Sequence, residues 1–279
     1  MVTVVFGARG SVGHHVAAGL RACGQEVRLT SRNPAAAGFP GDAQVADADL
    51  ERPETLGAAL DGARQAFLYA RPRGIDGFVA AARAAGVRRV ALLSSAAITG
   101  RDAQRNPIAR NHRAVELALE QSGLEWTFIR AGMFATNTLW WWQRAIREHG
   151  TVRLPYPEAQ TAPVHEKDLA ALAVAALTGD GHDGRVYTVY GPQSLTLRQQ
   201  VSLIGSAAGR AIGVEQVSPE RARAEMSRTV PAVGVDAILG SWEAGRHAPA
   251  PTSAVVEEVT GRAGLTFAQW AADHAGDFR

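Results

Sequence analysis

The amino-acid sequence predicts an α/β fold, a doubly wound parallel sheet followed by a smaller C-terminal lobe. Over about the first 130 residues, short apolar runs typical of buried strands alternate with segments of helical periodicity. The first strand leads directly into a glycine-rich turn at residues 7–13, and a helical segment follows that turn. A hydrophobic content of 46% in 279 residues is sufficient for a substantial core.

Each expected element rests on its own pattern of apolar residues, and strands that alternate with helices imply a parallel sheet. Strands are expected at residues 2–6, 26–30, 44–46, 66–70, 90–94, 126–129 and 186–189. Helices are expected at residues 11–23, 53–60, 74–85, 109–121, around 140–142, and at 167–177, 196–208, 218–227 and 266–275. An extended segment is expected at residues 152–157.

The turn after the first strand reads Gly7-Ala8-Arg9-Gly10-Ser11-Val12-Gly13 and has the spacing G-x-x-G-x-x-G. Glycines at such positions allow a tight turn, close approach of the backbone to a pyrophosphate, and close packing of helix on sheet. The N–H groups at the start of the following helix favour an anion. The sequence therefore predicts a Rossmann-type dinucleotide site that involves Gly7, Arg9, Gly10, Ser11, Val12 and Gly13.

The end of the second strand indicates which dinucleotide is bound. Sites for NAD carry an acidic residue about 20 residues beyond the glycines, where it binds the ribose hydroxyls. Here the segment is Thr30-Ser31-Arg32-Asn33, which contains no carboxylate. Arg32 offers a planar fork for a 2′-phosphate, and Ser31 and Asn33 offer further donors. The expected cofactor is NADP(H), bound by residues 1–150, and residues 151–279 are expected to add late sheet strands and a smaller substrate-side lobe.

The reactive groups differ from those of a typical short-chain dehydrogenase, which pairs a lysine with a tyrosine four residues before it. Lys167 is the only lysine, and Pro163 occupies that upstream position. Ser94 and Ser95 end the strand at 90–94, at the edge where α/β sheets bind ligands. His112 and Glu116 are one helical turn apart, so the carboxylate either makes His112 a proton donor or forms a surface ion pair with it.

Charge and composition exclude several classes of partner. The formal net charge of +2 is too small and too dispersed to predict a nucleic-acid surface. No apolar run is long enough to span a membrane, and we expect a cytoplasmic protein. Cys23, the single cysteine, is expected to pack with Val12, Val16 and Leu20. No metal site is expected.

These features resemble the NmrA-like atypical short-chain dehydrogenases, and in particular bacterial NADPH-dependent quinone oxidoreductases. The resemblance rests on residues 7–13, Arg32-Asn33-Pro34, Asp49-Leu50, Ser94-Ser95, His112 to Glu116, Ser122-Gly123, Trp126-Thr127, residues 130–134 with Asn137, residues 167–170, residues 260–262, and Phe267 with Trp270. Arg9 and Ala131 depart from the threonine and proline common in the family. The resemblance adds Asp49 and Ser94 to the expected cofactor contacts, and it implies an NADPH-dependent oxidoreductase.

The expected reaction is transfer of hydride to a quinone or a conjugated carbonyl compound, because such acceptors need no strong general acid. His112 and Ser95 are the candidate catalytic residues. Phe134, Trp140, Trp141 and Tyr156 are the candidates for binding a small aromatic substrate, although three consecutive tryptophans cannot all face one ligand from a helix. The alternative is a non-catalytic, NADP(H)-sensing regulator that acts through a protein partner, and a homodimer is compatible with either function.

Overall fold

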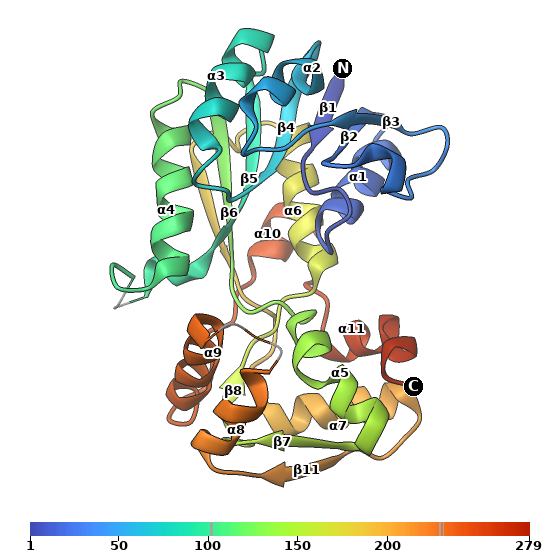
Figure 1. Ribbon diagram of the computed structural model, residues 1–279, viewed down its shortest axis with the longest axis vertical. Coiled ribbons are helices and arrows are strands. Elements are labelled where there is room, and N and C mark those ends of the chain that lie inside the picture. The colour runs from blue at the N-terminus through green and yellow to red at the C-terminus, as the bar shows by residue number, and fades with distance from the viewer. Residues whose placement is uncertain (101–102, 229, 231) are drawn as a thin grey trace. The chain divides into compact units, whose positions relative to one another are not determined.

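The computed structural model describes residues 1–100, 103–228, 230 and 232–279, and it divides into two compact units (Figure 1). The first unit comprises residues 1–132, 166–189 and 255–263. The second unit comprises residues 133–165, 190–254 and 264–279. The sequence predicts a cofactor domain at residues 1–150 and a mixed region at 151–279 that adds late strands to the sheet. In the structure, each compact unit combines three separate segments of the chain. The two units are described in turn.

A seven-stranded sheet forms the centre of the first unit (Figure 1). Its strands are β1 (Val2–Val5), β2 (Glu26–Ser31), β3 (Gln44–Asp47), β4 (Ala63–Tyr69), β5 (Arg89–Ser95), β6 (Glu125–Ala131) and β9 (Arg185–Val189). They are arranged in the order β3-β2-β1-β4-β5-β6-β9, and all their pairings are parallel. The order reverses between β1 and β4, which is where doubly wound sheets bind ligands. The predicted Rossmann-type fold is confirmed.

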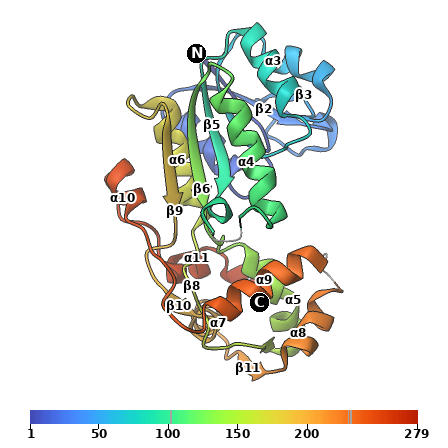
Figure 2. The same ribbon diagram turned by 90° about the vertical axis from the view of Figure 1, so that its left-hand side faces the viewer.

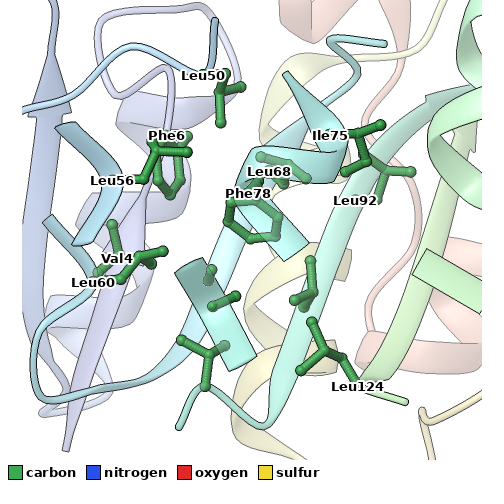
Figure 3. Packing of buried hydrophobic residues seen from close by; sticks show 14 of the residues in the cluster. Val4, Phe6, Leu50, Leu56, Leu60, Leu68, Ile75, Phe78, Leu92 and Leu124 are labelled. Carbon is green, nitrogen blue, oxygen red and sulfur yellow. The ribbon is translucent and has the colours of Figure 1, made fainter. Parts of the chain in front are cut away.

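Helices cover both faces of this sheet (Figures 1 and 2). One face carries α1 (Gly13–Ala22), α6 (Glu166–Thr178) and α10 (Val255–Thr260), and the other carries α2 (Leu56–Leu60), α3 (Ile75–Ala85) and α4 (Pro107–Glu120). Figure 3 shows the core beneath the second group, where Phe6, the residue after β1, meets Phe78 of α3 edge to face at 5.6 Å between ring centres. Burial of such large apolar side chains fixes α3 against the sheet.

The second unit contains helices and two small sheets. The helices are α5 (Asn137–His149), α7 (Leu197–Ala208), α8 (Pro219–Met226), α9 (Ala232–Ala244) and α11 (Phe267–Asp273). Strand β7 (Thr151–Leu154) pairs in parallel with β11 (Gly213–Gln216), and β8 (Gln160–Thr161) pairs antiparallel with β10 (Leu195–Thr196). Trp142, Trp242 and Trp270 are buried in its core, which gives this unit an aromatic centre of its own.

The structure corrects the expectation for Cys23, whose side chain is exposed rather than packed. Helix α1 ends at Ala22, and Gly24 leaves the helical path with a φ of 73°. Cys23 therefore lies beyond the last regular turn and leaves the apolar stripe that Val16 and Leu20 occupy. No helix of the described ranges combines the length and apolar character needed to cross a membrane.

Candidate functional site

The glycine turn joins β1 to α1 in a shape that side chains would prevent. Gly7 has a φ of 70°, and the N–H of Gly10 donates to its carbonyl at 2.8 Å. A Cβ atom on Gly13 would lie far inside van der Waals contact of that same carbonyl oxygen. The N–H of His14 in the first turn of α1 donates to the carbonyl of Gly10 at 3.2 Å. Val12 provides no side-chain cap for α1, so its side chain does not compete with an anion at the helix start. This is the geometry expected for pyrophosphate binding.

Tyr69, which ends β4 beside β1, packs on this turn. Its Cδ1 atom lies 2.9 Å from the position that a Cβ on Gly7 would take. The guanidinium carbon of Arg71 lies 5.7 Å from the centre of the Tyr69 ring. Sequence reasoning did not select Tyr69. Its position at the end of the strand beside the reversal of strand order was the signal that could have found it.

At the end of β2, Arg32 differs from its neighbours in how its side chain is used. The Oγ of Ser31 accepts from the N–H of Asn33 at 3.1 Å, and the Oδ1 of Asn33 accepts from the N–H of Ala36 at 3.3 Å. Both side chains therefore shape the turn that follows the strand. Arg32 is exposed, and the structure gives it no ion pair with any described residue. Of the three, its donors are the ones most available to a phosphate.

Asp49 and the exposed part of the glycine turn complete the predicted cofactor contacts. The Oδ1 of Asp49 accepts from the N–H of Glu51 at 3.0 Å, and its backbone N–H donates to Oγ1 of Thr55 at 3.0 Å. Asp49 therefore stabilises the turn after β3 by local hydrogen bonds. Arg9 and Ser11 are exposed on the glycine turn, where a ligand could reach them.

Ser94 lies in a buried polar network between the sheet and α4. Its Oγ donates to Oε1 of Glu116 at 2.7 Å, and Glu116 is completely buried. Arg130 of β6, the register partner of Ser94, holds both oxygens of Glu116, at 2.9 Å from Nε and 2.6 Å from Nη2. This double contact offsets the free-energy cost of burying the charged carboxylate of Glu116. The placement assigns Ser94 to the packing of α4 rather than to an exposed ligand surface.

The expected contact of His112 with Glu116 is wrong. The Glu116 oxygens bind Ser94, Arg113 and Arg130, as far as the chain is described. The half-buried His112 instead places Nδ1 2.8 Å from the carbonyl oxygen of Ile108, so Nδ1 carries a proton in this bond. The carboxylate of Glu120 also binds Arg113, and this hydrogen bond raises the pKa of the guanidinium.

Ser95, the other candidate catalytic residue, ends β5 one position after Ser94. Its Oγ accepts from the N–H of Ala97 at 3.2 Å and so begins a short 3-10 turn at Ala96–Thr99. Successive residues of a strand point to opposite faces. Ser95 therefore faces away from α4 and is only partly buried.

The predicted substrate residues all belong to the second unit. Helix α5 gives its three consecutive tryptophans different surroundings: Trp140 is 80% exposed, Trp141 is partly buried, and Trp142 is in the core. Trp141 meets Trp242 edge to face at 5.3 Å between ring centres. This division agrees with the expectation that the three could not share one ligand.

Phe134 and Tyr156, the other two candidates, are partly buried. Phe134 forms a β-bridge with Val164, and Tyr156 lies in the turn between β7 and β8. A groove of about 500 Å³ runs along α7. It is lined by residues that include Arg198, Ser202, Ser206 and Arg210, and none of the four predicted substrate residues lines it.

Comparison with known proteins identifies the family. Residues 7–180 match a protein family described as NAD(P)H-binding. The chain belongs to this NAD(P)H-binding family. The match includes the glycine turn, β2 with Arg32, and the buried network of α4. It confirms the cofactor class that the sequence predicted.

Individual relatives of this NAD(P)H-binding protein are reductases. It is 38% identical to the (4-alkanoyl-5-oxo-2,5-dihydrofuran-3-yl)methyl phosphate reductase of Streptomyces griseus subsp. griseus, over 99% of this chain and 98% of the relative. It is 32% identical to the NAD(P)H azoreductase of Xenophilus azovorans, with 84% of each chain covered. The NADPH-dependent quinone oxidoreductase of Escherichia coli, solved in complex with NADPH, is similar with a TM-score of 0.79 and 25% identity, over 98% of this chain and 99% of that one.

The protein is therefore an NAD(P)H-dependent reductase, and the predicted resemblance to NmrA-like quinone oxidoreductases is confirmed. Its residues fit the cofactor. Gly7 and Gly13 leave room that side chains would fill, and α1 begins without a side-chain cap. The exposed Arg32 lies where a carboxylate would favour NAD.

Proposed function

We propose that the protein uses NADPH to reduce an electron-poor conjugated carbonyl compound, a class that includes quinones and unsaturated lactones. The observation that carries this proposal is the glycine turn at α1 together with Arg32 at the end of β2, which is exposed and forms no ion pair with any described residue. An open helix start fits the pyrophosphate, and a guanidinium without a carboxylate partner fits the 2′-phosphate. The reductase relatives support the reaction class.

When bound, the cofactor would supply hydride. The residues of the chain would bind the cofactor, orient the acceptor and deliver a proton to it. The N–H groups at the start of α1 hold the pyrophosphate, and Arg32 distinguishes the phosphorylated ribose. Ser95 and His112 are the proposed residues for orienting the acceptor or delivering a proton. Because Nδ1 of His112 is bonded to the carbonyl of Ile108, Nε2 is the atom that would exchange a proton with the acceptor.

A conjugated acceptor fits the absence of a lysine-assisted tyrosine in the sequence. Hydride addition to such a molecule is driven mainly by correct positioning, so general acid assistance contributes less than in reduction of an isolated ketone. The Streptomyces relative is named for a substrate whose oxo-dihydrofuran ring carries a conjugated double bond. We favour this kind of acceptor, with quinones as a second group that the same chemistry would accommodate.

The test is turnover. Purified protein is mixed with NADPH and either a simple naphthoquinone or an unsaturated lactone, and both NADPH loss and reduced product are measured under anaerobic conditions. We expect steady turnover and one product formed for each NADPH consumed. A Gly13→Ala variant is the control, because it cannot form the cofactor turn. Tight NADPH binding without reduction of any acceptor, together with capture of a defined protein partner, would instead establish the regulator.

A further inference from the structure

Arg246 of the second unit stacks on an aromatic ring. Its guanidinium carbon lies 4.9 Å from the centre of the Tyr156 ring. Tyr156 lies in the turn between β7 and β8, and Arg246 follows the end of α9. Stacking on an aromatic face fixes the plane of a guanidinium and is attractive in itself.

The backbone on both sides of this pair is anchored. The N–H of Gln160 donates to the carbonyl of Gly245 at 2.9 Å, and a Cβ on Gly245 would lie 2.5 Å from the Gln160 oxygen. The Oγ of Ser194 donates to Oε1 of Gln160 at 2.9 Å and accepts from the N–H of Ala250 at 2.8 Å. Residue 245 is therefore held against the segment that follows Tyr156, and Arg246 is positioned by its neighbours.

Several arginines of the second unit are balanced by a nearby carboxylate, whereas Arg246 has no such partner in the described part of the chain. Arg153, Arg198 and Arg221 each lie within 4.0 Å of a glutamate. Arg246 is exposed, and it forms no ion pair with the residues that the structure describes. Stacking occupies the face of the guanidinium, whereas its N–H donors point outward in the plane of the group. They remain available for two parallel hydrogen bonds to a phosphate.

We propose that Arg246, held by Tyr156, is an anion subsite that binds a phosphate monoester carried by the conjugated acceptor. The inference rests on the proposed function and names the charged group of its substrate. The phosphate in the name of the Streptomyces relative's substrate is consistent with this chemistry. Arg246 is a specificity residue, since it would hold the charged group of the substrate and not the group that is reduced.

The first experiment compares a phosphorylated unsaturated lactone with the same lactone carrying a free alcohol. The wild type should have the higher kcat/KM for the phosphate ester. Arg246→Ala should raise KM for the ester by at least about 10-fold and leave the alcohol unchanged, because one charge-assisted contact is lost. Arg246→Lys should restore only part of the loss, since a lysine lacks the planar fork. Arg221→Ala, which removes the same charge from α8, is the control and should match wild type.

A second experiment measures binding without turnover, by calorimetric titration of the phosphate ester into protein saturated with NADP⁺. Weaker binding to Arg246→Ala by about 10-fold or more is expected. If no acceptor is reduced but this difference is found, the proposed function fails and the subsite stands. Equal kcat/KM for ester and alcohol in the wild type, or unchanged ester binding in Arg246→Ala, would overturn the subsite and leave the reductase proposal intact.

Discussion

At the end of β2 a single exposed guanidinium stands where an NAD site would carry a carboxylate. Ser31 and Asn33 bind the local backbone, so cofactor selectivity at this position depends mainly on Arg32. The residue's exposure also means that its removal should cost little stability.

Arg32→Ala should therefore lose affinity for NADPH while its affinity for NADH stays near wild type. One charge-assisted hydrogen bond of about 1.5–3 kcal/mol corresponds to roughly a 10- to 150-fold loss. Calorimetric titration with both cofactors measures it. Arg83→Ala, a change at an exposed arginine in the last turn of α3, is the matched control. Equal losses for the two cofactors would contradict the assignment.

His112→Ala should bind NADPH normally and lose turnover only moderately. With a confirmed acceptor, we expect a fall in kcat near or below the lower end of the roughly 10²- to 10⁴-fold range for general acid catalysis. Asn111→Ala, the exposed neighbour on α4, is the control. A wild-type pH profile of kcat in the variant would show that His112 is structural, and complete loss of activity would indicate a more demanding carbonyl reduction.

The sequence could identify Glu116 as important but not its partners. Residues four apart on a helix are neighbours, which is why Glu116 was assigned to His112. The partners in the structure, Ser94 and Arg130, come from two adjacent strands whose register brings them opposite each other. That register depends on tertiary packing and cannot be obtained from spacing along the chain.

Among the elements, the turn from β1 into α1 is the one that both sequence and structure define most sharply. Three glycines in a fixed spacing predicted it, and the structure gives each of the two outer ones a steric reason. The backbone path, rather than any side chain, forms the proposed pyrophosphate site.

Two separate replacements of glycine by alanine should distinguish the steric role of the turn from the general effect of alanine on helix propensity. Gly13→Ala should lower the melting temperature and abolish measurable NADPH binding, because its Cβ would collide with the carbonyl of Gly7. Gly57→Ala, in α2, meets no atom within 4 Å and should be neutral or stabilising by up to about 1 kcal/mol. Thermal melts with and without NADPH test both variants. Normal cofactor binding by Gly13→Ala would contradict the proposed turn.

The elements that sequence reasoning missed carry weak local signals. Strands β8 and β10 are two residues long, too short to show alternation. Helix α9 contains Gly234 and Gly240, which lower helix propensity, and α10 is rich in β-branched residues that favour strands. By contrast, the seven strands of the main sheet were found, because buried apolar runs are a strong signal.

At the scale of the whole molecule, the order of the chain and the compact units do not coincide. The first unit is completed by α6, β9 and α10, which follow long segments of the second unit. Gly19 of α1 lies so close to α6 that a Cβ there would be 2.8 Å from Cγ2 of Val174. Arg262, just after α10, forms an ion pair with Asp168 of α6, with 2.7 Å between Nη1 and Oδ1. Such long-range contacts leave no local trace in composition or periodicity.

A fragment of residues 1–150 should therefore be unstable and should not bind NADPH, because α1 and β6 would lose the elements that cover them. A fragment of residues 1–189 restores α6 and β9 and should recover binding in part. Circular dichroism melts and calorimetric titration of the two fragments make the comparison. Wild-type affinity in the shorter fragment would mean that residues 1–150 are sufficient for cofactor binding.

The late arrival of β9 has a consequence for synthesis on the ribosome. After β6 has emerged, residues 133–189 must still be translated before the sheet can add its last strand. At translation rates of about 5–20 residues per second, this takes roughly 3 to 11 s. For that time the nascent chain exposes the apolar side of α1 and an open strand edge on β6. We expect the incomplete nascent chain, more than the folded full-length protein, to be the species that aggregates and that chaperones bind.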